Sequence, residues 1–307
     1  MKGCQRLFNN SMEGPMDLET FIVTVYCKVD DFMKQNFLTE RLRKRGFEPK
    51  LSDAEVLTME IVGEYLGQET DKGIYQYFKR HWSSWFPHLP DRSNFLRQAA
   101  NLWAVKMKLF ESLQEGKSPY IQLLDSFPLP VCEFIRAKRT KLFKGIAAYG
   151  KWMGETFYGF RLHLKMNVIG NITGFQIAPA NCHDLTLLPE LTEKNIYGWV
   201  IGDKAFDSAP AREELLEKQH LCLYSPLRGE RTFPLPLESC KKFNSFRRRI
   251  ESLFAQFTQR FRMKRLWARD LWHLTVRIIR KILAHLFAVL FNLQLGRPAL
   301  SIASLVD

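Results

Sequence analysis

The stretch Ile121–Pro130 reads IQLLDSFPLP. Its first four residues are largely apolar, which is typical of a buried strand, and the run ends abruptly at the carboxylate of Asp125. Ser126, Pro128 and Pro130 then predict a turn. A single acid at the end of a buried strand is well placed to hold a metal ion, so this stretch predicts a site at the edge of a sheet.

A second apolar run, Trp199–Gly202, ends in the same way at Asp203. The glycine at its end leaves room for the close approach of backbone or ligand, and Lys204 could contact phosphate. Asp207 is a rival carboxylate, but its place before Pro210 favours a helix N-cap. The alternative for Asp125 and Asp203 is an ordinary turn aspartate; two strands ending alike favour metal binding.

A third acid, Glu251, lies on a predicted long helix. Glu251 follows Ile250 and so borders the buried face, and Arg247 lies one turn earlier, where it could orient Glu251 or grip DNA. The alternative is a surface ion pair between them, worth about 0.3–0.5 kcal/mol. The apolar face comprises Phe246, Ile250, Leu253, Phe254, Phe257 and Phe261.

Between these acids the pattern alternates between strands and helices. Residues 157–169 and 172–178 predict a hairpin with a turn at Gly170-Asn171, and residues 221–224 predict a further strand. Short helices are expected through Leu188 and from Pro210, with a loop at 226–242. The fold class is therefore α/β, a mixed sheet flanked by helices, in which sites form at the carboxyl ends of strands.

The N-terminal part is predicted to be helical. Residues 52–55 form a capping box, and the helix that begins near Pro90 carries Arg92 and Arg97 close to its start. This order predicts a helix-turn-helix-like DNA-binding domain; a helical bundle packed on the catalytic domain is the alternative. The predicted domains are a tail (1–16), the helical domain (17–116), the catalytic domain (120–265) and a C-terminal helical extension (266–307).

Composition indicates a polyanionic partner. The 307 residues carry a net charge of +13 with a pI near 9.5, so nucleic acid is the first candidate and an anionic membrane the second. Residues 241–270 hold ten Lys and Arg against two acids, and residues 133–165 hold eight against two. The six cysteines form no Cys-x-x-Cys pair, which favours a reduced cytosolic setting. The uncharged run 282–295 is shorter than the roughly 20 residues of a membrane span, so it predicts a packed helix.

The motif Asn181–Asp184 (NCHD) has two interpretations. His183 and Asp184 could form a secondary site group that positions water or phosphate. Alternatively, they make a turn in which Asp184 caps the following helix, and this interpretation is favoured. His163, on the predicted hairpin, is interpreted as a sheet residue or phosphate contact rather than a metal ligand.

Asp125, the NCHD motif, IGDKAFD (201–207) and RRIESLF (248–254) together resemble the DDE transposases of prokaryotic insertion sequences, most closely the group conventionally numbered 982. The resemblance implies a ribonuclease-H-like fold and a catalytic triad of Asp125, Asp203 and Glu251, spaced by 203 − 125 = 78 and 251 − 203 = 48 positions. Asp125 would bridge two Mg²⁺ (or Mn²⁺) ions, and the other two acids would each complete one. The implied reaction is hydrolysis at element ends, then attack of the freed 3′-OH on target DNA.

The implied partners are terminal-repeat and target DNA, bound by a homo-oligomer in the cytoplasm on the nucleoid, with no membrane. DNA contacts are expected from Lys204, Arg247 and Arg248, and from the two arginines near the start of the predicted recognition helix. Related groups have Tyr and Lys at positions occupied here by Asn244 and Thr258. The alternatives are a metal-dependent nuclease that does not join strands, and a non-catalytic or decayed DNA-binding protein.

Overall fold

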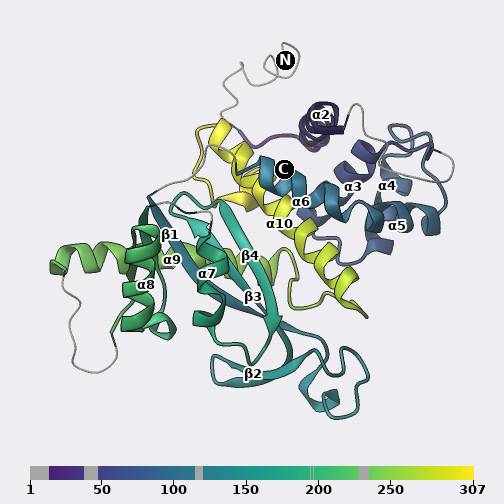
Figure 1. Ribbon diagram of the computed structural model, residues 1–307. Helices are drawn as coiled ribbons and strands as arrows, with labels where there is room; N and C mark the ends of the chain where they lie inside the picture. The colour runs from purple at the N-terminus through teal and green to yellow at the C-terminus, as the bar shows by residue number, and fades with distance from the viewer. Residues whose placement is uncertain (1–13, 38–47, 115–119, 194, 196, 228–234) are drawn as a thin grey trace. The chain divides into compact units, whose positions relative to one another are not determined.

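The computed structural model (Figure 1) describes residues 14–37, 48–114, 120–193, 195, 197–227 and 235–307. Two compact units make up the chain. The helical unit comprises residues 1–113, 260–262 and 272–307, and the sheet unit comprises 114–259 and 263–271. The segment 115–119, which spans the predicted boundary between the helical and catalytic domains, and most of the predicted tail lie outside the described residues.

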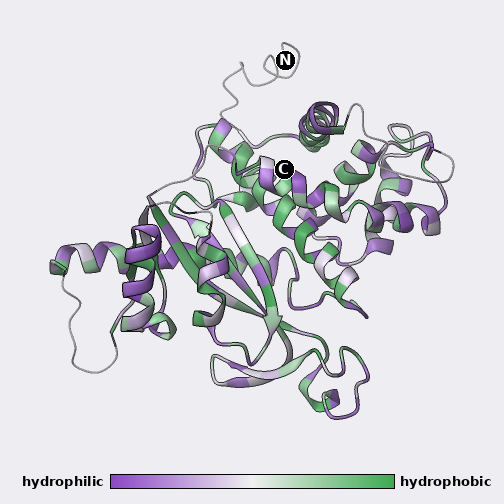
Figure 2. Cartoon of the chain, viewed as in Figure 1, coloured by the Kyte–Doolittle hydropathy of each residue, from purple (hydrophilic) through white to green (hydrophobic). Residues whose placement is uncertain are grey.

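The helical unit contains the predicted N-terminal helices and a long C-terminal one. They are α2 (Leu18–Phe37), α3 (Asp53–Tyr65), α4 (Asp71–His81), α5 (Arg92–Asn101), α6 (Trp103–Ser112) and α10 (Leu271–Gln294). The capping box is confirmed: Ser52 Oγ accepts from the Glu55 amide, and the Glu55 carboxylate accepts from the Ser52 amide. Figure 2 shows α10 as largely apolar, in keeping with its burial along most of its length. No helix of the described residues has the length and apolar character to cross a membrane.

Buried ion pairs connect α10 to α3 and α4. The Arg280 guanidinium lies 2.5 Å from the Glu64 carboxylate and 2.6 Å from Asp71. Lys281 also pairs with Glu64, at 2.5 Å, and both cations are almost fully buried. Buried charges are costly unless they are paired, so the two cations of α10 require the carboxylates that α3 and α4 supply.

The sheet unit is built on a mixed sheet. Its described strands are β1 (Ile121–Pro130), β2 (Ala148–Trp152), β3 (Glu155–Asn167), β4 (Ile172–Pro179), β5 (Gly198–Ile201) and β6 (Leu221–Tyr224). Strand β3 pairs antiparallel with β1, β2 and β4, whereas β1–β5 and β5–β6 are parallel. This arrangement confirms the predicted mixed sheet flanked by helices, including the hairpin and the strand at 221–224.

Helices cover both faces of this sheet. On one face, Leu124 belongs to a core that includes Leu188 of α7 (Leu188–Thr192) and Leu215 of α8 (Ala209–Gln219). On the other face, the Phe127 ring contacts Phe254 and Phe257 of α9 (Leu237–Gln259). Because side chains alternate along a strand, Asp125 shares the α9 face with Phe127.

Strand β1 runs further than the sequence predicts. The expected turn after Asp125 is wrong, because β1 continues to Pro130 and stays paired with β3 over that whole length. Its parallel partner β5 accompanies it only as far as Leu123. Beyond that point, the described residues pair with β1 on one side only, and a proline is tolerated in such an edge because its missing N–H costs no ladder hydrogen bond there. Asp125 therefore lies within β1, just past the end of β5.

The segment between β1 and β3, which carries no predicted element, contains β2. We call residues 131–154 the β2 arm; Figure 1 shows it extending past the rest of the sheet unit. Its hairpin with β3 turns at Met153 and Gly154, both with positive φ (49° and 85°). Positive φ at both central residues is the turn that suits strand twist, but a methionine there gives no sequence signal of it.

Candidate active site

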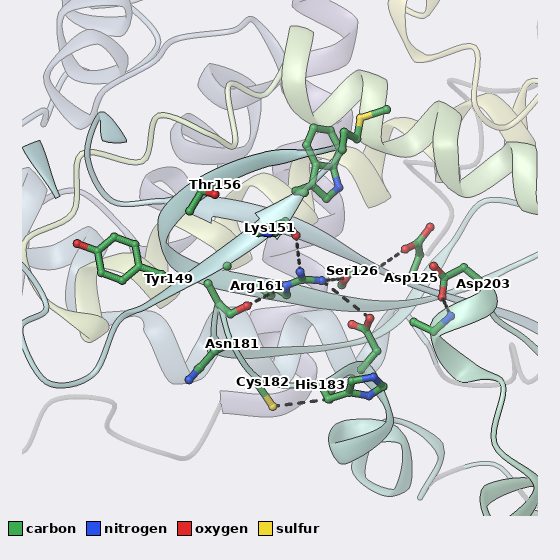
Figure 3. Close-up of a pocket in the computed structure, with 16 residues that line it drawn as sticks. Asp125, Ser126, Tyr149, Lys151, Thr156, Arg161, Asn181, Cys182, His183 and Asp203 are labelled. Atoms are coloured by element: carbon green, nitrogen blue, oxygen red, sulfur yellow. Dashed lines mark hydrogen bonds and ion pairs between the residues drawn. The ribbon is translucent and has the colours of Figure 1, made fainter. Parts of the chain in front are cut away.

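A cavity of about 690 Å³ opens in the sheet unit beside the end of β5 (Figure 3). Asp125, Asp184 and Asp203 line it, together with Arg161 and residues of the β2 arm. In Figure 3, Asp125 and Asp203 lie at one end of the cavity and Tyr149 at the other. The structure thus brings together two of the three predicted catalytic acids.

Local backbone geometry fixes the two aspartates. Asp125 Oδ1 accepts from the amide of Ser126 at 2.7 Å, and Asp203 Oδ1 accepts from the amide of Ala205 at 2.8 Å. Asp203 thereby caps the short helix η4 (Lys204–Phe206). Each carboxylate keeps a second oxygen that these hydrogen bonds do not use.

Gly202 has a packing role. A Cβ at this position would lie 2.4 Å from the ring of Phe206, which is buried against the sheet. The predicted close approach is therefore made by Phe206, and it sets where the chain turns after β5 and presents Asp203.

Asp125 is hard to ionise in this setting. Burial is the main cause that raises its pKa to about 7, and the negative charges of Asp203 and Asp184 add to it. The Ser126 amide and the positive charge of Arg247 act in the opposite direction. A desolvated carboxylate beside others of like charge gains strongly from a bound cation.

Glu251 is placed differently from the two aspartates. Its side chain is exposed on α9, and it is not among the residues that line the cavity. Within the described residues, no three His, Cys, Asp or Glu side chains are arranged as a metal site. Even so, α9 packs on the face of β1 that carries Asp125, and Arg247, which is close enough to affect Asp125, lies one turn before Glu251.

The NCHD motif is arranged differently from the favoured interpretation. His183, not Asp184, caps the following 3-10 helix, with Nδ1 accepting from the amide of Leu185 at 3.3 Å. Asp184 is buried instead, and His163 Nδ1 lies 3.0 Å from its Oδ1. Burial acts to raise the pKa of Asp184, but His163, Ser126 and Arg161 outweigh it and lower that pKa. The predicted cap at Asp184 is thus wrong because a buried partner draws the carboxylate inward.

Arg161 of β3 is a site residue that the sequence analysis did not single out. Its guanidinium donates to Ser126 Oγ at 3.1 Å and to the carbonyl oxygens of Ala180 at 3.0 Å and Lys151 at 2.6 Å. It also lies 3.9 Å from Asp184. One side chain therefore links β1, β3, the chain after β4 and the β2 arm. Polar and apolar residues alternate along the predicted strand 157–169, and Arg161 and His163 lie on its polar face. That alternation was the sequence signal from which Arg161 could have been singled out.

The predicted DNA-binding residues lie on both units. Lys204 and Arg248 are exposed in the sheet unit and Arg247 is half-buried there, whereas Arg92 and Arg97 are exposed on α5 of the helical unit. Their contact with DNA stays a prediction.

The predicted N-cap at Asp207 is wrong. Ser208 caps α8, and the Asp207 carboxylate instead accepts from Arg212 at 2.7 Å. This ion pair engages Asp207 outside the cavity lining, so it does not compete with Asp203 for the site.

Comparison with known proteins gives one family match. Residues 115–266 match a family model described as a transposase DDE domain. No curated protein matches the chain. Among solved structures, a piggyBac transposase synaptic complex with hairpin DNA is 10% identical, with a TM-score of 0.43, over 92% of this chain and 83% of that one. A Mos1 transposase paired-end complex with the left transposon end is 13% identical, with a TM-score of 0.21, over 77% and 87%. Both TM-scores are below 0.5, so neither superposition establishes a shared fold.

Proposed function

We propose that the chain, whose residues 115–266 match the family model of a transposase DDE domain, is a transposase that cleaves DNA at element ends and joins the freed strand to target DNA. The observation that carries this proposal is the convergence of Asp125 and Asp203, far apart in sequence, on one cavity. We also propose that the chain belongs to the insertion-sequence group numbered 982, and that it acts as a homo-oligomer on the nucleoid.

The residues present fit a hard divalent cation. Asp125 and Asp203 offer carboxylate oxygens, which Mg²⁺ and Mn²⁺ prefer, and the raised pKa of Asp125 indicates that its ionised form lacks a compensating charge. Asp125 and Asp203 would hold the metal, with Glu251 of α9 as the third proposed ligand. When bound, the metal would stabilise negative charge on the reacting phosphate oxygens.

The chain's own cations would orient the DNA backbone. Lys204 directly follows Asp203 and is exposed, so it can reach a phosphate at the cavity edge. Arg247 lies close enough to lower the pKa of Asp125 and is placed to contact the same strand. Arg161, with its guanidinium committed to Ser126 and two carbonyls, would instead hold the walls of the cavity in register.

Strand joining tests the proposal. The substrate is the DNA that flanks the coding region, searched for inverted repeats and supplied with a plasmid target and Mg²⁺ or Mn²⁺. Asp125→Asn, Asp203→Asn and Glu251→Gln should each abolish joined product while DNA binding persists. Glu190→Gln, an exposed acid on α7, is the matched control and should stay active. Full joining activity in all three variants would contradict the assignment of Asp125, Asp203 and Glu251 as the catalytic triad.

The pattern of products separates the alternatives. Cleaved ends that never join to the plasmid would identify a nuclease. DNA binding with no cleavage, and no calorimetric heat of Mn²⁺ binding beyond that of Asp125→Asn, would identify a non-catalytic or decayed protein. An Asp184→Asn variant that loses activity while Glu251→Gln keeps it would move the third ligand from α9 to the NCHD motif.

A further inference from the structure

The β2 arm exposes an unusual set of large apolar side chains. Phe134 is 56% exposed, Tyr149 47%, Ile135 85% and Met153 83%. Single exposed apolar residues are ordinary, but several in one short segment are costly in water unless something covers them. Two of the four are aromatic, and their rings contact each other, with centroids 6.3 Å apart.

The same arm is strongly basic. Glu133 is its single acid, and it pairs at 3.7 Å with Arg136 at the solvent-exposed surface. The cations of the arm are Arg136, Lys138, Arg139, Lys141, Lys144 and Lys151. Exposed rings among cations are what a single nucleic-acid strand requires, because bases stack on the rings while the cations neutralise phosphates. This charge opposes docking of another basic chain such as a second copy of the arm.

The arm is continuous with the candidate active site. Tyr149, Lys151 and Met153 line the cavity, and Arg161 ties the Lys151 carbonyl to the wall that carries Ser126 (Figure 3). The Tyr149 ring is also supported from behind by Tyr158 of β3, at 5.1 Å. A strand that lies on the arm would therefore lead directly to Asp125 and Asp203.

We infer that the β2 arm binds an unpaired DNA strand next to the cleavage site, with bases stacked on Phe134 and Tyr149 and phosphates held by the neighbouring cations. The inference rests on the proposed function, since it assigns the form of DNA that the same site takes. Unpaired DNA is favoured over duplex because a duplex presents only its backbone and groove edges to the arm. Its bases could not stack on the rings of Phe134 and Tyr149.

The test measures, by fluorescence anisotropy and without metal, how tightly the protein binds a labelled single DNA strand and the matching duplex. Phe134→Ala and Tyr149→Ala should each weaken single-strand binding by about tenfold, within the range for loss of one base–aromatic stack, and leave duplex binding nearly unchanged. The matched control is Tyr197→Ala. Tyr197 is 55% exposed and pairs with Tyr120 at 5.1 Å, but it precedes β5 and so lies at the opposite end of that strand from the cavity.

A charge variant completes the design. Lys138→Ala with Arg139→Ala should weaken binding of both DNA forms and reduce its salt dependence, because phosphate contacts do not distinguish them. Equal losses on duplex and single strand for Phe134→Ala and Tyr149→Ala, or no loss, would overturn the inference even if strand joining is normal. If the two variants lose single-strand binding selectively but the wild-type protein never cleaves DNA, the binding surface is supported and the proposed function is contradicted.

Discussion

The ammonium group of Lys264 lies 4.0 Å from the centre of the Trp152 ring and 5.8 Å from that of Phe127. Lys264 follows α9, whereas Trp152 ends β2 and lines the candidate active site. Burial lowers the pKa of Lys264, which Glu155 partly offsets. This cation–π contact therefore links the β2 arm to the segment that follows α9.

We expect Lys264→Ala to reduce the free energy of unfolding by about 1 kcal/mol, the size of a partly desolvated cation–π contact. Urea unfolding followed by circular dichroism measures the change, and Arg265→Ala, which removes a neighbouring exposed cation, should have little effect. In a double-mutant cycle with Trp152→Leu the two effects should be non-additive. Simple addition would show that the contact contributes nothing.

Asp125→Asn should stabilise the metal-free protein, and more so at high pH. The folded-state pKa of Asp125 is raised to about 7, whereas an unfolded aspartate titrates near about 4. The native state therefore holds the extra proton between these values, and the free energy of unfolding falls by about 1.4 kcal/mol per pH unit as pH rises through that window.

Denaturant unfolding of Asp125→Asn and wild type, without metal, checks this at about pH 5 and about pH 8, inside and above the window. The variant's advantage should grow between the two and then remain constant. Glu190→Gln serves as the control acid. An advantage that does not change with pH would show that Asp125 ionises normally.

Gly202→Ala should disturb the site through packing. The new methyl group would lie 2.4 Å from Phe206 Cδ2, so Phe206 and the short helix that follows Asp203 must shift. Overpacking of this kind costs roughly 1–3 kcal/mol. The metal affinity should fall together with the melting temperature.

Gly174→Ala is the matched control for this change. Its methyl group would meet the buried Lys165 side chain at 3.2 Å, so it makes a milder clash on β4, away from Asp203. Wild-type Mn²⁺ binding by Gly202→Ala in calorimetry would contradict the link between Phe206 packing and the placement of Asp203.

Arg280→Met should destabilise the helical unit strongly. The substitution leaves the carboxylates of Glu60, Glu64 and Asp71 short of a buried cation, and breaking such a network by removal of one partner costs about 3–5 kcal/mol. Thermal unfolding measures the loss. Lys218→Met removes an exposed cation that pairs with Glu214 at 2.7 Å and should change stability by less than about 1 kcal/mol. Similar effects of the two would show that the buried network is not needed.

Much of the sheet unit was predictable from local patterns. The hairpin of β3 and β4 follows from alternation and its Gly170-Asn171 turn, and the apolar run before Asp203 predicts β5. The extension of β1 past Asp125 was not predictable from composition. Its prolines resemble a turn, and they fit a strand because β5 ends at Ile201 and no other described strand pairs with that side of β1.

Short-range apolar patterning was enough to predict a mixed α/β domain in which Asp203 directly follows a buried strand, but it placed Asp125 at a strand end, whereas Asp125 lies within β1 beside the end of β5. Three further features appear only in the folded chain: Asp184 turns inward to His163, Arg161 joins four segments around the cavity, and Tyr149 and Met153 reach the cavity edge. No local pattern predicts them, because each depends on partners that are distant along the chain. A local pattern can set which way a backbone runs, but it carries no record of which buried charge or ring will lie opposite a given side chain.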